Sequence, residues 1–101
     1  MKKIGKNAGV EFDIVLANGK SVAIIEAKNR IHPNDVKKLV DEKIAKFREF
    51  FPYYKNHKIY LGIAGFSFSK AVPEKAQKYG VGIIRQVGEA IEVEAGHLTA
   101  Y

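Results

Sequence analysis

The dipeptide Asn18-Gly19 lies between two apolar stretches and is the strongest local constraint on how this chain can fold. A two-residue β-turn of type I′ needs positive φ at both central positions, and Asn and Gly adopt that conformation at the lowest cost. We therefore expect residues 9–30 to form a β-hairpin in which Ala17 pairs with Lys20. Counting outward from this pair places Glu11 opposite Glu26.

Side chains alternate between the two faces of a strand, so the hairpin sorts its residues into two sets. One set is apolar and predicts a core face covered by a helix; it consists of Val10, Phe12, Ile14, Leu16, Ala23, Ile25 and Ala27. The other set has charges at the end far from the turn and apolar residues nearer to it; it consists of Glu11, Asp13, Glu26, Lys28, Val15, Val22 and Ile24. The hairpin thus gathers its charges at one place.

The acids of this cluster repel one another. Glu11 and Glu26, directly opposite, would have Cβ atoms about 5 Å apart, and like charges at that distance destabilise a strand pair. Lys28 neutralises part of the repulsion, and a divalent cation such as Mg²⁺, which prefers carboxylate oxygens and water, would neutralise more. From spacing alone an ion-pair patch on a solvated strand explains the same cluster, and that alternative stays open.

The order of Asp13, twelve further residues and Glu26-Ala27-Lys28 at the end of an apolar strand resembles the PD-(D/E)XK nuclease superfamily. The order of expected elements resembles the common core of that family over most of the chain. The resemblance implies an α/β fold with a restriction-endonuclease-like core, in which helices flank a central mixed β-sheet. We expect the helix that normally begins this core to be missing from residues 1–101.

The resemblance also implies roles for individual residues. Asp13, Glu26 and the backbone carbonyl of Ala27 would bind Mg²⁺ or Mn²⁺, with Glu11 as an accessory acid. Asp13, Glu26 and Lys28 would be catalytic, and Lys28 would orient or deprotonate the attacking water and stabilise charge on the phosphate. Metal-bound water is a stronger nucleophile at neutral pH, and cations stabilise the charge that develops on a phosphate under attack.

The function expected from this site is metal-dependent hydrolysis of phosphodiester bonds, in DNA rather than RNA. One alternative is a catalytically silent module with the nuclease fold that binds nucleic acid or assembles subunits. A purely structural domain is another alternative. The formal net charge of +6 favours a polyanionic partner through counterion release, which supports either nucleic-acid reading.

Length and composition limit the organisation of the chain. Its 101 residues, 47% of them hydrophobic, predict a single domain over residues 1–101, with residues 95–101 as a loose tail. Whether the chain is a fragment of a longer protein stays open. It has no cysteine, no apolar run that could span a membrane and no signal-peptide segment, so we expect a cytoplasmic protein without membrane contact.

The rest of the chain alternates between helices and strands. Apolar residues at helical spacing predict a long helix over 36–51, followed by a buried strand over 58–68. A second helix over about 70–79, a strand at 81–87 and a short edge strand complete the expected order. Lys43 falls within the apolar arc of the long helix, which is explained by snorkelling or by a role near the site.

Other common kinds of active site find no support in the sequence. The histidines, His32, His57 and His97, lack the spacing of zinc ligands, and Ser67 and Ser69 have no partnered His and Asp in the spacing of a hydrolase triad.

The apolar residues on the charged face predict association. Val15, Val22 and Ile24 would be exposed there, and burying each is worth roughly 1.5–3 kcal/mol. We therefore expect another chain to cover them, either in a homodimer or as a segment upstream of Met1 in a longer parent protein.

Overall fold

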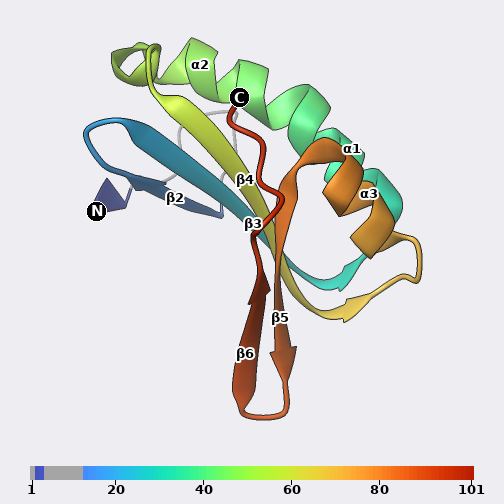
Figure 1. Cartoon of the computed structure of the whole chain (residues 1–101). Helices are drawn as coiled ribbons and strands as arrows, with labels where there is room; N and C mark the ends of the chain where they lie inside the picture. Colours follow the sequence, from blue (N-terminus) through green and yellow to red (C-terminus); the bar gives the residue numbers. More distant parts are fainter. Residues whose placement is uncertain (1, 4–12) are drawn as a thin grey trace.

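The computed structural model describes residues 2–3 and 13–101 (Figure 1). The strands are β1 (Lys2–Lys3), β2 (Ile14–Ala17), β3 (Ser21–Ile31), β4 (Lys58–Phe68), β5 (Val81–Val87) and β6 (Ala90–Glu94). The helical segments are α1 (Pro33–Lys38), the π-helical turn η1 (Leu39–Lys43), α2 (Ile44–Phe50), the 3-10 turn η2 (Pro52–Tyr54) and α3 (Val72–Tyr79). The expected mixed α/β class is confirmed.

The described strands form one mixed sheet in the order β1-β2-β3-β4-β5-β6. Strands β1, β2 and β3 are antiparallel neighbours, β3, β4 and β5 are parallel, and β6 returns antiparallel to β5. Parallel neighbours need a crossover, which the segment from α1 to η2 supplies between β3 and β4 and α3 supplies between β4 and β5. Both crossovers step the same way across the sheet, so the general preference for right-handed crossovers puts their helices on one face (Figure 1).

The hairpin of β2 and β3 has a different register from the one expected. Ala17 pairs with Val22 and Ile14 with Ile25, a shift of two residues that makes the predicted pairing of Ala17 with Lys20 wrong. Asn18 lies at the first position of the turn instead of its centre, because its Oδ1 accepts hydrogen bonds from the backbone N–H groups of Lys20 and Ser21, both at 2.8 Å. An even shift leaves each side chain on its expected face.

The core lies on the opposite face of the hairpin from the one expected. Val15, Val22 and Ile24 are only 0%, 1% and 1% exposed. They share one core cluster with residues of the helices and the other strands, including Val36, Leu39, Phe47, Ile59, Leu61, Ile63, Val72, Ala76, Val81 and Ile83. Both crossovers lie on this face, so it is covered within the chain and the reason for expecting a homodimer or an upstream segment to cover it is removed.

The face expected to be the core is less well covered. Its members on β2 and β3 are half-buried, except for the exposed Ala27; the half-buried ones are Ile14, Leu16, Ala23 and Ile25. Val10 and Phe12, also expected on this face, lie outside the described residues, as does Glu11. This part of the sheet therefore does not receive the long helix.

The end of the chain is attached to the sheet instead of forming the expected loose tail. Tyr101 exchanges two backbone hydrogen bonds with Ile59, of 3.0 and 2.8 Å, and the Thr99 N–H donates to the Gly80 carbonyl at 3.0 Å. Strand β5 begins opposite Leu61, which leaves the edge of β4 near Ile59 available to this segment. Within the described residues no helix has the length and apolar character to cross a membrane.

The change of core face can be tested by matched truncations. We expect Ile24→Ala to lower the free energy of unfolding by about 2–5 kcal/mol, because it removes buried methyl groups and leaves a cavity in the core. Ile91→Ala, at a residue that is 69% exposed, should change it by less than about 0.5 kcal/mol. Urea unfolding followed by circular dichroism measures both, and similar small changes in the two variants would contradict this assignment of the core.

Candidate functional site

The candidate site lies where β3 passes the start of β2. The observed register, continued by one residue beyond the pair of Ile14 and Ile25, places Asp13 opposite Glu26. The Asp13 Oδ2 atom accepts a hydrogen bond from the backbone N–H of Ala27 at 2.9 Å, which ties the acid to β3. Two predicted site residues, Asp13 and Glu26, are thereby brought together, and Glu11, which was expected opposite Glu26, lies outside the described residues.

Two adjoining hollows lie beside this carboxylate pair. One is a cavity of about 200 Å³ lined by Asp13, Ile24, Ile25, Glu26, Lys28, Leu39 and Lys43. The other, of about 270 Å³, is lined by Glu26, Lys28, Asp35, Lys38, Glu42, Lys43 and Lys46. Glu26, Lys28 and Lys43 line both hollows, so one charged depression runs between β3 and the helical segment that follows it.

Glu26 is a half-buried acid of the site. Burial raises the pKa of its carboxyl group; the charge of Lys43 and, more weakly, that of Lys28 oppose this, while the neighbouring Asp13 carboxylate adds to it. The net result is a pKa above the ordinary value. The charged form of Glu26 is therefore incompletely stabilised by its protein surroundings, and a cation placed between the two carboxylates would stabilise it.

Lys28 is fixed by an ion pair. Its Nζ atom donates a hydrogen bond of 2.7 Å to Asp35 Oδ1, and this bond raises the pKa of Lys28 above its ordinary value. The side chain is thus an ammonium group at neutral pH, which can donate hydrogen bonds and supply positive charge but cannot accept a proton. The expected roles of Lys28, to orient or to deprotonate the attacking water, stay predictions.

Asp35, the acid that holds Lys28, is not among the site residues expected from the sequence. Burial opposes ionisation of Asp35, but hydrogen bonds from Lys28 and from the His32 N–H, the latter 2.7 Å to Oδ2, bring its pKa below the ordinary value. The His32 imidazole Nδ1 lies 3.1 Å from Ser69 Oγ, which extends the network towards α3. The sequence does carry one signal for Asp35: it is an acid at the third helical position after the N-cap residue His32, as in a capping box.

Lys43 lies at the end of the π-helical turn between α1 and α2. Such turns are rare and occur often at functional sites, because they change the direction in which the following side chains point. Lys43 lines both hollows, and its charge lowers the pKa of Glu26. Of the two readings of Lys43, the structure supports a position at the site.

The donor set at the site is small. Among residues 2–3 and 13–101, no group of three or more His, Cys, Asp or Glu side chains gathers as a metal site would. Mg²⁺ nonetheless commonly uses only one or two protein carboxylates and completes its shell with water and substrate phosphate. Asp13 and Glu26, adjacent to the Ala27 backbone, meet that smaller requirement.

Comparison with known proteins adds no identification, since no protein-family model, curated protein or solved structure matches this chain.

The role of Asp35 leads to a pH-dependent prediction. We expect Asp35→Asn to lower the free energy of unfolding at pH 7 by about 1 kcal/mol, because one charge-assisted hydrogen bond is lost at a helix start. Because the pKa of Asp35 is lower in the folded than in the unfolded protein, ionised Asp35 stabilises the fold at pH values above its ordinary pKa of 3.8. This contribution is lost as the pH falls through the folded-state pKa. The difference from wild type should therefore vanish in acid.

Urea unfolding at a series of pH values measures this effect. Asp41→Asn, at an exposed acid on the same helical segment, is the matched control and should change little. The assigned role of Asp35 would be contradicted if Asp35→Asn were as stable as wild type at pH 7. It would also be contradicted if the loss in free energy of unfolding stayed the same in acid.

Proposed function

We propose that this chain is a metal-dependent nuclease domain with a restriction-endonuclease-like core that hydrolyses phosphodiester bonds in DNA. The observation that carries the proposal is that Asp13, a half-buried Glu26 and Lys28, which is bonded to Asp35, line one hollow. Two acids and a cation at one end of a strand match the residues that the resemblance assigns to such a site. The order of β2, β3, the helical crossover and the parallel β4 is compatible with that core.

The residues fit a hard divalent cation. Asp13 and Glu26 would hold Mg²⁺ or Mn²⁺ together with the Ala27 carbonyl, and Glu11 would be an accessory ligand. Bound there, the cation would supply an activated water and stabilise charge on the phosphate. The raised pKa of Glu26 supports this fit, because a carboxylate that is poorly stabilised by its surroundings gains most from an added cation.

The remaining residues would act on the phosphodiester directly. Lys28, held by Asp35, would donate a hydrogen bond to a phosphate oxygen and stabilise the negative charge that develops during attack. Lys43 would add a second positive charge from the opposite side of the depression. Asp35 would act as a positioning residue, since it restricts where the ammonium group can point.

A nucleic-acid partner is supported by the charges around the depression. Lys38 and Lys46 line it together with Lys28 and Lys43, and the whole chain carries a formal charge of +6. Contacts of lysines with backbone phosphates release counterions, so binding should weaken steeply as salt is added. A cytoplasmic location fits this proposal, because the chain has no cysteine to form disulfides.

A catalytically silent module is the second candidate. It is favoured by the small donor set, two carboxylates within the part of the chain that the structure describes, and by the engagement of Lys28 with Asp35. Such a protein would bind DNA through the same depression without cleaving it.

A cleavage assay separates the two candidates. We expect wild type to cut plasmid or single-stranded DNA with Mg²⁺ or Mn²⁺ but not with EDTA. Glu26→Gln should abolish cutting, and Lys28→Met should slow it by about a hundredfold, because it removes a donor that stabilises the charge developing on the phosphate. Glu49→Gln, at an exposed acid on α2, is the matched control and should cut like wild type.

Two results would count against the nuclease proposal. Cutting that is equally fast in wild type, Asp13→Asn and Glu26→Gln would place the activity elsewhere or in a contaminant. Salt-sensitive binding by wild type with no cutting under either metal would favour the silent module.

A further inference from the structure

Lys43 lies on the helical segment at a place where the fold otherwise buries apolar side chains. It follows Leu39 by four residues and precedes Phe47 by four, and both of these are 0% exposed. Residues at this spacing share one face of a helix, so the stem of Lys43 starts on the buried side of the segment. Lys43 is half-buried, whereas Lys38 and Lys46 are exposed. Nearby acids must therefore offset its charge, because a charge taken out of water without a partner is costly.

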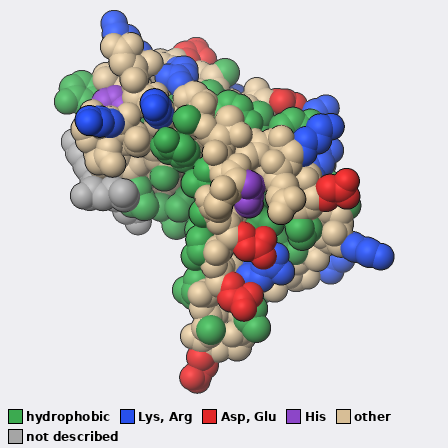
Figure 2. Space-filling model, in the orientation of Figure 1, with side chains coloured by type: hydrophobic (Ala, Val, Ile, Leu, Met, Phe, Trp, Pro, Cys, Tyr) green, Lys and Arg blue, Asp and Glu red, His purple; other side chains and the backbone are tan. Residues whose placement is uncertain are grey.

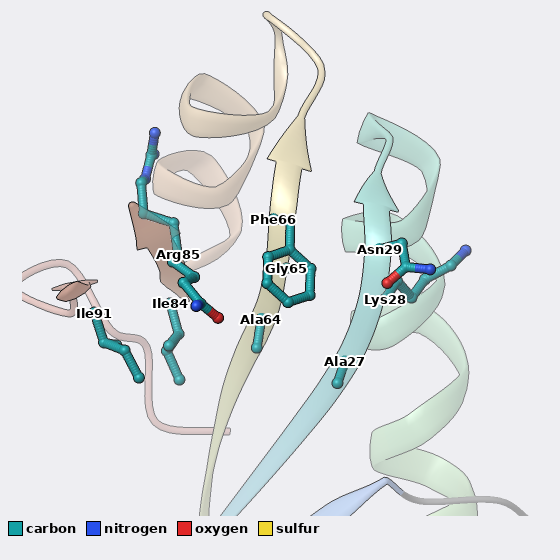
Figure 3. Close-up of a pocket in the computed structure, with 10 residues that line it drawn as sticks. Ala27, Lys28, Asn29, Ala64, Gly65, Phe66, Ile84, Arg85 and Ile91 are labelled. Atoms are coloured by element: carbon teal, nitrogen blue, oxygen red, sulfur yellow. The ribbon is translucent and has the colours of Figure 1, made fainter. Parts of the chain in front are cut away.

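The face of the sheet on which these acids lie is identified by Lys28. Figure 3, drawn around a groove on the sheet face that the helices leave uncovered, shows the Lys28 side chain turned away from the Phe66 ring. The bond of Lys28 to Asp35, in the first turn of α1, places its ammonium group on the helix side. Glu26 precedes Lys28 by two residues on the same strand, so it faces the same side. The charged depression is therefore separate from the groove of Figure 3.

Asp13 and Glu26 are the acids that Lys43 is placed to offset. All three residues line the smaller hollow of about 200 Å³. The charge of Lys43 lowers the pKa of Glu26 more strongly than the charge of Lys28 does. The ammonium group of Lys28 is instead engaged by Asp35, at 2.7 Å.

A divalent cation at these acids would meet Lys43 in the same hollow. Mg²⁺ between Asp13 and Glu26 would repel the ammonium group of Lys43 at short range. The larger hollow of about 270 Å³ offers that group another position, because Lys43 lines it as well, together with the acids Asp35 and Glu42. The flexible four-carbon stem of a lysine lets its charged end move between two adjoining positions.

We propose that Lys43 is a built-in counter-ion of Asp13 and Glu26, which a divalent metal ion displaces into the larger hollow when it binds. The inference rests on the metal site of the proposed nuclease function. The displaced ammonium group would join Lys38 and Lys46, which line the larger hollow where DNA phosphates are expected. Binding of metal and binding of DNA would therefore favour each other.

The general positive charge of the chain has to be separated from this local effect. Lys and Arg side chains lie in several separate places on the face shown in Figure 2, and the formal net charge is +6. Removal of any lysine would raise the affinity for a cation slightly, although salt screens exposed charges that lie more than about 8–10 Å apart. Lys46→Met is the matched control, because Lys46 is exposed and lines the larger hollow but not the smaller one.

The test measures metal binding without DNA. Electron paramagnetic resonance of free Mn²⁺ gives the metal affinity of the whole chain after EDTA treatment and dialysis. We expect Lys43→Met to bind Mn²⁺ about fivefold or more tightly than wild type, because the competing charge is gone. Lys46→Met should stay within about twofold of wild type in physiological salt. Lys43→Gln, which also removes the charge, serves for the same comparison if Lys43→Met does not fold.

Nuclear magnetic resonance of the wild-type protein tests the displacement itself. The nitrogen signal of Lys43 Nζ is assigned by its absence from the spectrum of the Lys43 variant. We expect this signal to shift as Mg²⁺ is added, while the signal of Lys46 Nζ changes much less.

Several outcomes would overturn the inference: equal Mn²⁺ affinity in wild type and the Lys43 variant, an equal gain in the Lys43 and Lys46 variants, no Mn²⁺ binding by any of these proteins, or a Lys43 signal that Mg²⁺ leaves unchanged. Each of these outcomes is independent of DNA cleavage. Wild type that cuts DNA without the expected change in affinity would keep the nuclease proposal and remove this inference. Displacement of Lys43 without cutting would keep the inference and favour the silent module.

Discussion

The approach of Asp13 to β3, where its carboxylate bonds the Ala27 N–H beside Glu26, is the constraint on which the site depends. It is set by the Asn18 side chain, whose oxygen accepts two backbone hydrogen bonds and moves Asn18 to the first position of the turn. This register, continued by one residue, brings Asp13 beside Glu26, and the Asp13 carboxylate raises the pKa of Glu26. The pair makes physical sense when positive charge lies nearby.

That positive charge comes from elements that the fold places on the same face. The helices lie on the face that carries the buried Val15, Val22 and Ile24, and Glu26, on the same face, is half-buried at the edge of this core. Lys28 is held from the start of α1 by Asp35, and the π-helical turn sets Lys43 beside Glu26. Burial, ion pairing and helix placement therefore act together on one small depression.

Much of this could be predicted from local patterns, because the hairpin, the helix–strand order and the gathering of Asp13, Glu26 and Lys28 follow from periodicity and spacing. Which face of the hairpin joins the core could not be predicted, since both faces are apolar near the turn and only the crossovers decide which face is covered. The predicted register of the hairpin was wrong because the Asn18 side chain accepts hydrogen bonds within the turn and Asn18 occupies its first position. Asp35 joins the site through a tertiary contact with Lys28, for which the sequence carries only a weak signal.

The most direct test of this account is the titration of the Glu26 carboxyl carbon by NMR. We expect a midpoint above the ordinary value of 4.5 in metal-free protein, because burial and the Asp13 charge disfavour ionisation. Added Mg²⁺ should lower that midpoint, and Asp13→Asn should lower it in the absence of metal. A midpoint at or below 4.5 that neither Mg²⁺ nor Asp13→Asn changes would contradict a carboxylate pair built to hold a cation.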